Sequence, residues 1–201
     1  HLGELQALMR VGAGKLRGAA IDYVNQGRRR TGAGKAVARP AAAPAPAWLQ
    51  AAGPTLARTA RVTIPGAPTT GGVRHELLLT DGNGRVEENA GRWIHRAPLP
   101  HVIEFHWDHP IRLGAARLIS GYHHNGAVDA PVQDFSLQWH DGHGWKDVPG
   151  TAVQGNRLPD WSGTVTAIET SRLRLRVTAT KDGTSRIWEM ELYAPPPSKA
   201  P

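Results

Sequence analysis

The sequence has no cysteine among its 201 residues, so neither disulfide bonds nor thiolate chemistry can contribute to its stability or activity. No apolar run approaches the roughly 18 residues that a membrane-spanning helix requires, so we expect no membrane span. The Gly-x-Ser-x-Gly motif, which presents a nucleophilic serine in many hydrolases, is also absent. Phenylalanine and tyrosine are scarce, with two and three copies, whereas tryptophan occurs seven times. Nothing in the composition therefore singles out a catalytic nucleophile.

Positive charge and aromatic residues are concentrated in different parts of the chain. Residues 1–61 carry ten Lys and Arg against two acids, a net charge of +8, whereas residues 62–201 carry fourteen against fifteen, a net charge of −1. Six of the seven tryptophans and nine of the ten histidines lie in the second part. Two regions with different physical character thus share the chain.

The basic excess belongs to a predicted helix and a predicted linker. In residues 1–32, apolar side chains recur every three to four positions, which predicts a helix. We expect this helix to be the tail of a preceding domain, or else to pack on the domain that follows. Only one aromatic residue, Tyr23, lies among its basic residues, so nucleic acid is not an expected partner. Residues 33–56 are rich in Pro, Ala and Gly and predict a stiff, extended linker.

Residues 57–195 predict a domain built from β-strands alone, followed by a Pro-rich tail at 196–201. Short apolar or alternating runs are separated by Gly, Pro, Asn and Asp, the residues that favour turns. No helical periodicity interrupts them, which indicates an all-β, antiparallel jelly-roll β-sandwich. The expected strands are residues 60–64, 75–79, 92–95, 101–107, 115–122, 133–140, 145–148, 164–169, 171–180 and 185–193.

The last two strands show the alternation most clearly. In residues 171–180 three apolar residues alternate with three arginines, so we expect the apolar set in the core and the guanidinium groups in water. A Lys-Asp-Gly turn follows, and it allows the chain to reverse. The second strand predicts two opposite faces, with Trp188, Met190 and Leu192 on one and Glu189 and Glu191 on the other.

Four sequence patterns, taken in order, resemble one known family of domains. They are TDGN at 80–83 with GRWI at 91–94, IEF at 103–105 with PIRL at 110–113, DFSLQ at 134–138 with DGHGWKDV at 141–148, and WEMELY at 188–193. Together they resemble the discoidin-like (coagulation factor V/VIII type C) domains, and in particular family 32 carbohydrate-binding modules. The resemblance covers residues 60–194 and implies a galactose-binding-domain-like sandwich that binds a ligand without catalysing a reaction.

The resemblance also implies a structural calcium ion (Ca²⁺) that joins the early loop to the last strand. Calcium takes about six to eight oxygen atoms from carboxylates and backbone carbonyls. Asp81 and Glu189 match the family's side-chain ligands, and Asn83 and Trp188 lie where backbone carbonyls contribute. The sequence departs from the family at Val86, where a hydroxyl ligand is often found.

Two alternatives remain open for these residues. Glu87, Glu88 or Asn89 can replace the missing ligand, which would keep a calcium site in the loop. Otherwise Asp81 forms an ordinary Asp-Gly turn, and Glu189 is a solvated side chain on the outer face of its strand.

The segment from Tyr122 to Asn125 is the strongest candidate for a sugar-binding loop. Aromatic faces cover the apolar C–H patches of sugars, while His, Arg and Asn side chains hydrogen-bond the hydroxyl groups. The family presents its ligand on loops at one end of the sandwich, so other loops contribute candidates. The expected ligand-binding residues are Arg92, Tyr122, His123, His124, Asn125, Trp161, Lys181 and Asp182. Trp161 has an alternative role, which is to plug the end of the sandwich.

Two pairs of histidines invite comparison with a metal-dependent catalytic site. His123 and His124 are adjacent, and His140 and His143 flank an Asp-Gly turn. Neither pair has the i, i+4 spacing of metal ligands on a helix, and adjacent residues of a strand point to opposite faces. Turn geometry explains His140 and His143 better than metal binding does.

These patterns favour a non-catalytic module that binds a glycan or polysaccharide. We expect it to be the C-terminal accessory domain of a larger secreted bacterial carbohydrate-active enzyme, and hence to work outside the cytoplasm. The alternative is a structural or protein-interaction module with no glycan ligand. Exposed aromatic side chains near His123 favour the glycan-binding module, and a sandwich end covered by the N-terminal segments favours the interaction module.

Overall fold

The computed structural model describes residues 45–66 and 75–196, which all belong to the second of two compact units, residues 43–201. The predicted helix at 1–32 lies outside the described residues, as do the first half of the predicted linker and most of the Pro-rich tail. No helix in the described part of the chain is long and apolar enough to cross a membrane.

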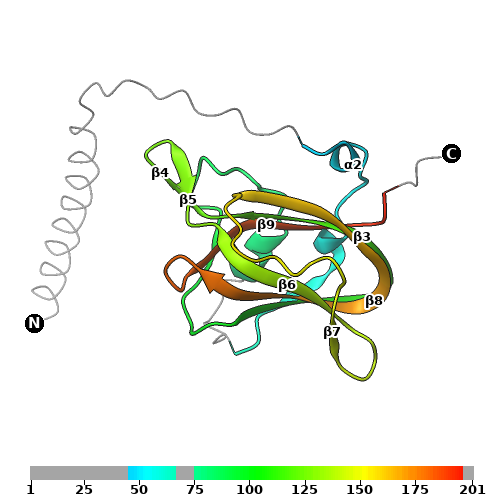
Figure 1. Ribbon diagram of the computed structural model, residues 1–201. Coiled ribbons are helices and arrows are strands. Elements are labelled where there is room, and N and C mark those ends of the chain that lie inside the picture. The colour runs from blue at the N-terminus through cyan, green and yellow to red at the C-terminus, as the bar shows by residue number, and fades with distance from the viewer. Residues whose placement is uncertain (1–44, 67–74, 197–201) are drawn as a thin grey trace, which may run out of the picture. The chain divides into compact units, whose positions relative to one another are not determined.

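Strands dominate the described residues, and helical segments are short (Figure 1). The helical segments are α2 (Ala47–Gln50) and the 3-10 helices η1 (Leu56–Thr59) and η2 (His75–Leu79). The strands are β1 (Arg61–Thr63), β2 (Trp93–His95), β3 (His101–Ser120), β4 (Tyr122–His124), β5 (Ala127–Asp129), β6 (Val132–His140), β7 (Trp145–Asp147), β8 (Asp160–Thr180) and β9 (Ser185–Tyr193).

All strands except the β4–β5 hairpin belong to one antiparallel sheet that folds over to make two layers. Its order is β2-β9-β3-β8-β6-β7, with β1 paired to β3. The first half of β3 pairs with β1 and with the second half of β8. These segments, together with β6 and β7, form what we call the front layer. The second half of β3 pairs with β9 and with the start of β8. These segments, together with β2, form the back layer. The predicted jelly-roll β-sandwich is confirmed.

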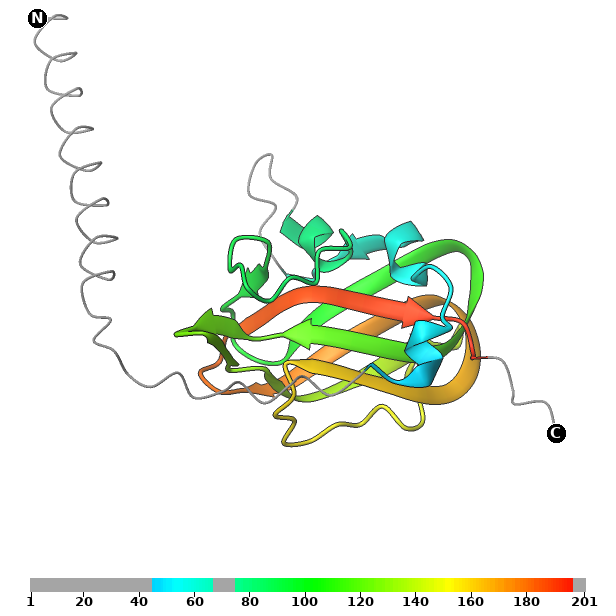
Figure 2. The ribbon, with the colours of Figure 1, turned by 90° about the horizontal axis from the view of Figure 1, so that it is seen from above.

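The strands β3 and β8 bend together at one end of the sandwich, where they pass from one layer to the other (Figure 2). Their register shifts between His106 and Ile111, and again between Leu113 and Ala115. Pro110 lies in the first interval and has no N–H to donate to a neighbouring strand, so the ladder is interrupted there while the chain stays extended. The sequence predicted two separate strands on either side of each bend, and in the structure each pair is one long strand.

Two short elements also differ from the prediction. The segment predicted as a strand at 75–79 is the 3-10 helix η2. Its leucines are consecutive and do not alternate with polar residues, and Leu79 is fully buried whereas Leu77 is exposed. The loop predicted after Tyr122 forms the β4–β5 hairpin, because Asn125 and Gly126 both adopt the positive φ values (50° and 78°) that a tight two-residue turn requires.

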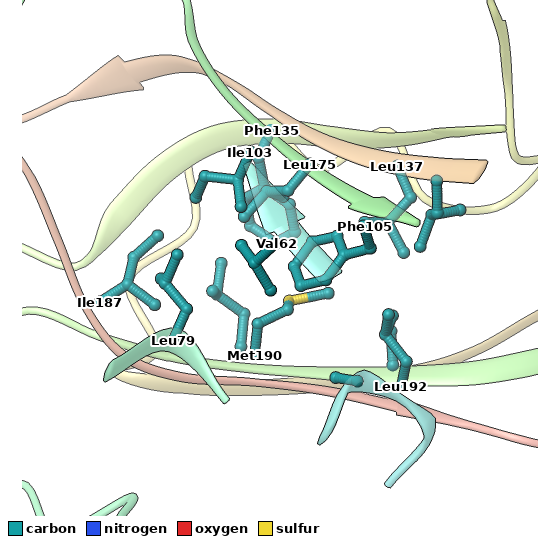
Figure 3. Packing of buried hydrophobic residues seen from close by; sticks show 14 of the residues in the cluster. Val62, Leu79, Ile103, Phe105, Phe135, Leu137, Leu175, Ile187, Met190 and Leu192 are labelled. Carbon is teal, nitrogen blue, oxygen red and sulfur yellow. The ribbon is translucent and has the colours of Figure 1, made fainter. Parts of the chain in front are cut away.

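The hydrophobic core lies between the two layers (Figure 3). The apolar residues that alternate along β8, Leu173, Leu175 and Val177, are fully buried there, as predicted. Burying one such side chain removes it from water at a gain of about 1.5–3 kcal/mol, so the core is the main source of stability. The arginines that alternate with them are partly buried instead of lying free in water, because neighbouring side chains cover that face.

The strand β9 departs from the alternation predicted for it. Its register with β3 shifts at Trp188, which is an extra residue in a β-bulge. As a result Ile187, and not Trp188 as predicted, joins Met190 and Leu192 in the core cluster. Trp188 is fully buried outside that cluster, and its indole Nε1 donates a hydrogen bond to the carbonyl of Glu88 at 2.7 Å.

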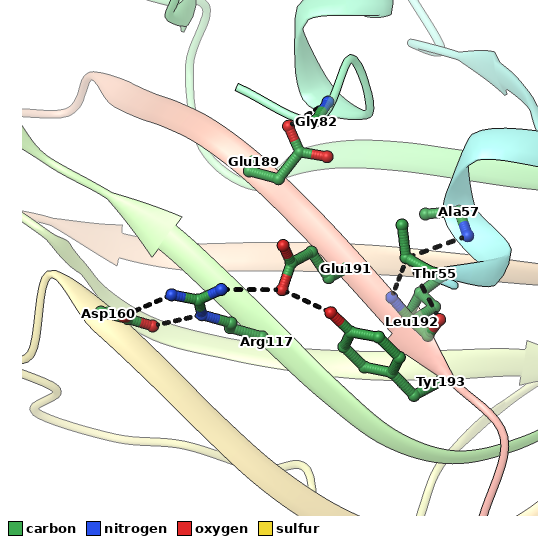
Figure 4. A network of polar contacts seen from close by, with 9 residues as sticks. All are labelled: Thr55, Ala57, Gly82, Arg117, Asp160, Glu189, Glu191, Leu192 and Tyr193. Atoms are coloured by element: carbon green, nitrogen blue, oxygen red, sulfur yellow. Dashed lines mark hydrogen bonds and ion pairs between the residues drawn. The ribbon is translucent and has the colours of Figure 1, made fainter. Parts of the chain in front are cut away.

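The described end of the predicted linker is folded, which differs from the extended chain expected there. Pro46 precedes the short helix α2, and the indole of Trp48 contacts the ring of Tyr193 edge-on, with 5.9 Å between centroids. Thr55 caps η1 by accepting a hydrogen bond from the N–H of Ala57, and it bonds both the N–H and the carbonyl of Leu192 (Figure 4). Two aromatic rings and a threonine hydroxyl therefore fasten this segment to the end of β9.

Candidate functional site

The β4–β5 hairpin presents an aromatic surface at the end of the sandwich opposite the bend. Tyr122 is 38% exposed, and its ring stacks on that of His124 with centroids 5.8 Å apart and planes 17° from parallel. Both residues lie on β4 at alternate positions, so the strand itself places them on one face. Stacked, exposed rings of this kind can cover the apolar face of a sugar.

Arg92 supports this surface from below. Its side chain is 8% exposed, and it donates hydrogen bonds to the carbonyls of Gly121 (3.0 Å) and Asn89 (3.2 Å). The guanidinium lies 4.9 Å from the ring centroid of Tyr122 and 5.6 Å from that of Trp188. Burial, with a smaller contribution from the charge of Arg186, lowers the pKa of Arg92. Arg92 thus holds the Tyr122 ring over the buried Trp188 by cation–π contact.

The turn between β8 and β9 brings charged side chains to the same hairpin. Lys181 bonds Asp129 of β5 at 2.6 Å, and Arg186 bonds both carboxylate oxygens of Asp182 at 2.9 and 2.7 Å. The hydrogen bond from Arg186 lowers the pKa of Asp182 to about 2, so this carboxylate is ionised at neutral pH. The guanidinium of Arg186 also lies 5.9 Å from the ring of Tyr122.

Asn89 ties the hairpin to the loop that precedes β2. Its amide group donates to the carbonyl of His123 at 2.8 Å and accepts from the N–H of His123 at 3.0 Å. This two-point bond fixes the backbone of β4 and therefore the direction in which Tyr122 and His124 point.

The structure therefore gathers most of the predicted ligand-binding residues in one place. Arg92, Tyr122, His124, Lys181 and Asp182 are linked by the contacts above, and His123 and Asn125 belong to the same hairpin. The ring of Trp161 instead packs edge-on against Phe135 at 5.0 Å, at the margin of the core.

Sequence reasoning did not include Asn89, Asp129 or Arg186 among the ligand-binding residues. Their roles depend on contacts between segments far apart in the chain, except for the i, i+4 pair of Asp182 and Arg186 across the turn. That spacing, with opposite charges on both sides of a Gly turn, was the one local signal that could have found Arg186.

The predicted metal ligands Glu189 and Asp81 also meet. Glu189 is fully buried, and its Oε2 accepts a hydrogen bond from the N–H of Gly82 at 3.1 Å (Figure 4). Among the described residues, no group donates to its Oε1, which is buried. Burial, together with the charge and hydrogen bond of Asp81, raises the pKa of Glu189 to about 8. The alternative in which Glu189 is a solvated side chain is therefore wrong.

The loop around Asp81 has the geometry of an Asx turn. The N–H of Asn83 donates to Oδ1 of Asp81 at 2.8 Å, and Gly82 adopts a φ of 84° that favours glycine. Of the proposed substitute ligands, Glu88 uses its carbonyl for Trp188, and Asn89 uses its amide for the hairpin.

These residues fit a hard cation. Two carboxyl groups lie in contact, and one of them has a buried oxygen to which no described residue donates; a divalent ion would neutralise such a pair. Within the described ranges, no cluster of three or more His, Cys, Asp and Glu is placed to hold a metal ion. A cation between Asp81 and Glu189 would therefore draw its remaining ligands from backbone carbonyls and water.

No protein-family model and no curated protein matches this sequence. Solved structures do match its fold. The family 32 carbohydrate-binding module of EndoD from Streptococcus pneumoniae shares 20% identity at a TM-score of 0.55, over 68% of this chain and 98% of that one. Chitosan-binding module 2 of a Paenibacillus chitosanase/glucanase, solved with chitotriose, shares 19% identity at a TM-score of 0.53, over 69% of this chain and 98% of that one. This chain has the discoidin-like fold.

A third match places the discoidin-like fold inside a longer protein. A putative α-L-fucosidase from Bacteroides thetaiotaomicron shares 16% identity at a TM-score of 0.55, over 71% of this chain but only 29% of that one. In the present discoidin-like sandwich, the β4–β5 hairpin carries the Tyr122 surface at the end opposite the bend, and Asp81 of the early loop contacts Glu189 of β9.

Proposed function

We propose that this protein is a non-catalytic glycan-binding module, and that its site is the exposed Tyr122–His124 surface. The observation that carries the proposal is the stacked pair of rings, held from below by the buried guanidinium of Arg92. A sugar lying on these rings would meet hydrogen-bonding groups on both sides, from the Lys181–Asp182 turn and from the Asn125 turn. The fold also supports the proposal, because one module of the same fold was solved with chitotriose.

The charges around the surface favour a neutral or mildly acidic glycan. Lys181 is paired with Asp129 and Arg186 with Asp182, so the exposed charges largely cancel. Such shallow sites bury little of the sugar and leave many hydroxyl groups in water. We therefore expect affinities on the order of micromolar to millimolar.

We further propose that Ca²⁺ binds between Asp81 and Glu189, with Asn83 and Trp188 contributing backbone carbonyls. Support comes from the buried Oε1 of Glu189, which lacks a donor among the described residues, and from its contact with Asp81. When bound, the ion would neutralise two adjacent carboxylates and join the early loop to β9. Because Trp188 also contacts Arg92, this junction would support the sugar-binding surface as well.

We propose that the module works as an accessory domain of a larger secreted carbohydrate-active enzyme, at the C-terminal side of the catalytic domain and outside the cytoplasm. Support comes from the fold, which occupies less than a third of the Bacteroides chain that it matches. The alternative, a module that serves only protein interaction, would be favoured by a sandwich end covered by the N-terminal segments. The described segment 45–60 contacts Leu192 and Tyr193, at the opposite end of β9 from the Lys181 turn and hence away from the Tyr122 surface.

The test is binding to a glycan array and retention by polysaccharides in affinity electrophoresis. His124→Ala should remove detectable binding, because losing one hydrogen-bonding partner costs roughly 1–3 kcal/mol of a small total. His143→Ala is the matched control, since His143 is exposed in the β6–β7 turn and, among the described residues, only its backbone N–H finds a hydrogen-bond partner. If no glycan is retained, or if both variants retain all glycans equally, the protein-interaction alternative replaces this proposal.

A further inference from the structure

The outer face of the back layer continues the Tyr122 surface toward strand β2. Arg186 of β9 lies directly opposite Ile94 of β2, and the neighbouring pair, Trp93 and Ile187, points into the core. Successive residues of a strand point to opposite faces, so Ile94 and Arg186 share the outer face. Residues opposite each other in an antiparallel pair have Cβ atoms about 4.5–5.5 Å apart. Ile94 and Arg186 are therefore direct neighbours on that face.

Arg186 is also a direct neighbour of the sugar-binding surface. Its guanidinium lies 5.9 Å from the ring centroid of Tyr122, and both carboxylate oxygens of Asp182 hold it in place. The side chain of Arg186 is only 16% exposed, so it lies along the face and does not project into water. The order across the outer face is therefore Tyr122, Arg186 and Ile94.

Ile94 is the exposed apolar side chain at the end of this row. It is 40% exposed, and Tyr122 at the other end is 38% exposed. Single exposed apolar residues are common on protein surfaces and need no explanation by themselves. Ile94 is different because it and Tyr122 lie on the two sides of one fixed guanidinium, next to the stacked rings of Tyr122 and His124.

Hydrogen-bonding groups lie on both sides of Ile94. Among the described strands, β2 pairs with β9 alone, so its other edge presents backbone N–H and C=O groups that no described strand uses. On the Arg186 side, the carboxylate of Asp182 is half exposed and can accept hydroxyl groups. An apolar centre with polar groups on both sides matches a sugar ring, which has apolar C–H patches and hydroxyl groups.

We propose that the glycan-binding site continues from Tyr122 across Arg186 to Ile94, and that it takes at least two consecutive sugar residues of an oligosaccharide or polysaccharide. This rests on the proposed function, because the first sugar lies on the rings of Tyr122 and His124. The second sugar places a C–H face on Ile94, and its hydroxyl groups meet Asp182 and the outer edge of β2. Ile94 is then the residue that distinguishes a glycan chain from a single sugar.

The test compares single sugars with short chains of the same sugar, on the full protein. The probes are galactose, glucose, mannose and N-acetylglucosamine, each as the free sugar and as its β-linked di- and trisaccharide, and NMR titration gives the affinities. In at least one series we expect the trisaccharide to bind at least about tenfold more tightly than the free sugar. Ile94→Ala should weaken binding of that trisaccharide about three- to tenfold, because the second sugar loses part of its apolar contact, and it should leave binding of the free sugar unchanged.

Two further variants separate the second sugar position from other effects. Leu158→Ala is the matched control, because Leu158 is 58% exposed and precedes β8, which is separated from β2 by β9 and β3 in the sheet order. It should bind every probe as the unmodified chain does. Tyr122→Ala should lose the free sugar and the trisaccharide alike. Ile94 and Leu158 are both exposed, so neither substitution should change the melting temperature appreciably.

The outcomes distinguish this inference from the proposed function. If free sugar and trisaccharide bind equally in every series that binds, or if Ile94→Ala binds the trisaccharide normally, the second sugar position is refuted while the proposed function stands. A trisaccharide also gains affinity statistically, because it offers several equal residues, but that gain is the same in Ile94→Ala. Equal losses in Ile94→Ala and Leu158→Ala, or an equal loss of the free sugar in Ile94→Ala, would also overturn the inference. If no probe binds and the glycan array retains none, the proposed function fails and this inference fails with it.

Discussion

Replacing Glu189 by glutamine tests the buried carboxyl pair directly. The pKa of Glu189 is raised from 4.5 to about 8, so the folded state binds its proton more tightly than the unfolded state does. The associated stability is fully present below about pH 4.5 and is lost as the pH rises through about 8. In chelator, the free energy of unfolding of the unmodified chain should therefore fall across this range. Glu189→Gln keeps the size and the acceptor for the N–H of Gly82, and it carries no charge.

The structure sets the size of the effect. Each pKa unit corresponds to about 1.4 kcal/mol, which gives an upper limit of about 5 kcal/mol for the full change. Asp81 and Gly82 are exposed, so water screens the carboxylate, and we expect about 2–3 kcal/mol at pH 8.5. For a chain of this size, that free energy corresponds to a melting temperature roughly 4–12 °C higher for Glu189→Gln in chelator.

Calcium should largely remove this difference in stability between the two proteins. A ligand at a hundredfold excess over its Kd stabilises the folded state by about 2.7 kcal/mol, and Glu189→Gln should lack most of this gain. The assay is thermal unfolding between pH 5 and 8.5 with calcium or with chelator. Equal melting temperatures of the two proteins in chelator at every pH would refute the inference that the buried carboxylate of Glu189 destabilises the folded state. If calcium does not change the melting curve of the unmodified chain, the proposed Ca²⁺ site between Asp81 and Glu189 is refuted.

Four further outcomes are expected. Asp81→Ala should abolish any response of the melting temperature to calcium, whereas Asp108→Ala, a change at an exposed acid, should keep it. Arg92→Ala should cost about 2–3 kcal/mol in chemical denaturation, because one buried and one partly buried carbonyl group lose their donor, and Arg96→Ala on the exposed loop should cost under about 0.5 kcal/mol. Leu175→Ala should cost about 2–5 kcal/mol and Leu158→Ala, at an exposed position, almost nothing; equal costs would contradict the core assignment. A chain that starts at residue 55 should unfold cooperatively in circular dichroism, whereas one that starts at 61 should be less stable, because Ala57 is fully buried and Trp107 donates to the carbonyl of Leu56.

The sequence predicted the sandwich well because its strands obey a local rule. Where one face of a strand meets the core and the other meets polar groups, as at Leu173 and Leu175, alternation in the sequence reports the alternation in space. The rule fails where the backbone breaks the alternation. The β-bulge at Trp188 adds one residue to β9 and so shifts the alternation of inward and outward side chains by one position. Nothing in the composition of the strand marks this bulge.

The candidate site was predictable residue by residue but not as an arrangement. The turn residues Asn125 and Gly126 are plain in the sequence, yet their hairpin was missed because each strand has only three residues. The position of Arg92 under Tyr122, and the two-point bond of Asn89, join segments about 30 residues apart in sequence. Contacts of this kind follow from the packing of the two layers, which alternation does not specify. Glu189 shows the same limit, because alternation puts it on the polar face, and only the family resemblance linked it to the early loop that covers it.

Because β3 and β8 run continuously through both layers, the two ends of the sandwich differ in how well they tolerate changes of chain length. At the bend the layers share the same two backbones, so a change of length there shifts the pairing of both layers at once. At the opposite end the chain passes between strands through turns, such as the β4–β5 hairpin and the Lys181 turn. Residues can be inserted or exchanged in these turns without moving any strand pair. Evolution and protein engineering can therefore alter the surface presented at that end while the cooperative unfolding of the sandwich is preserved.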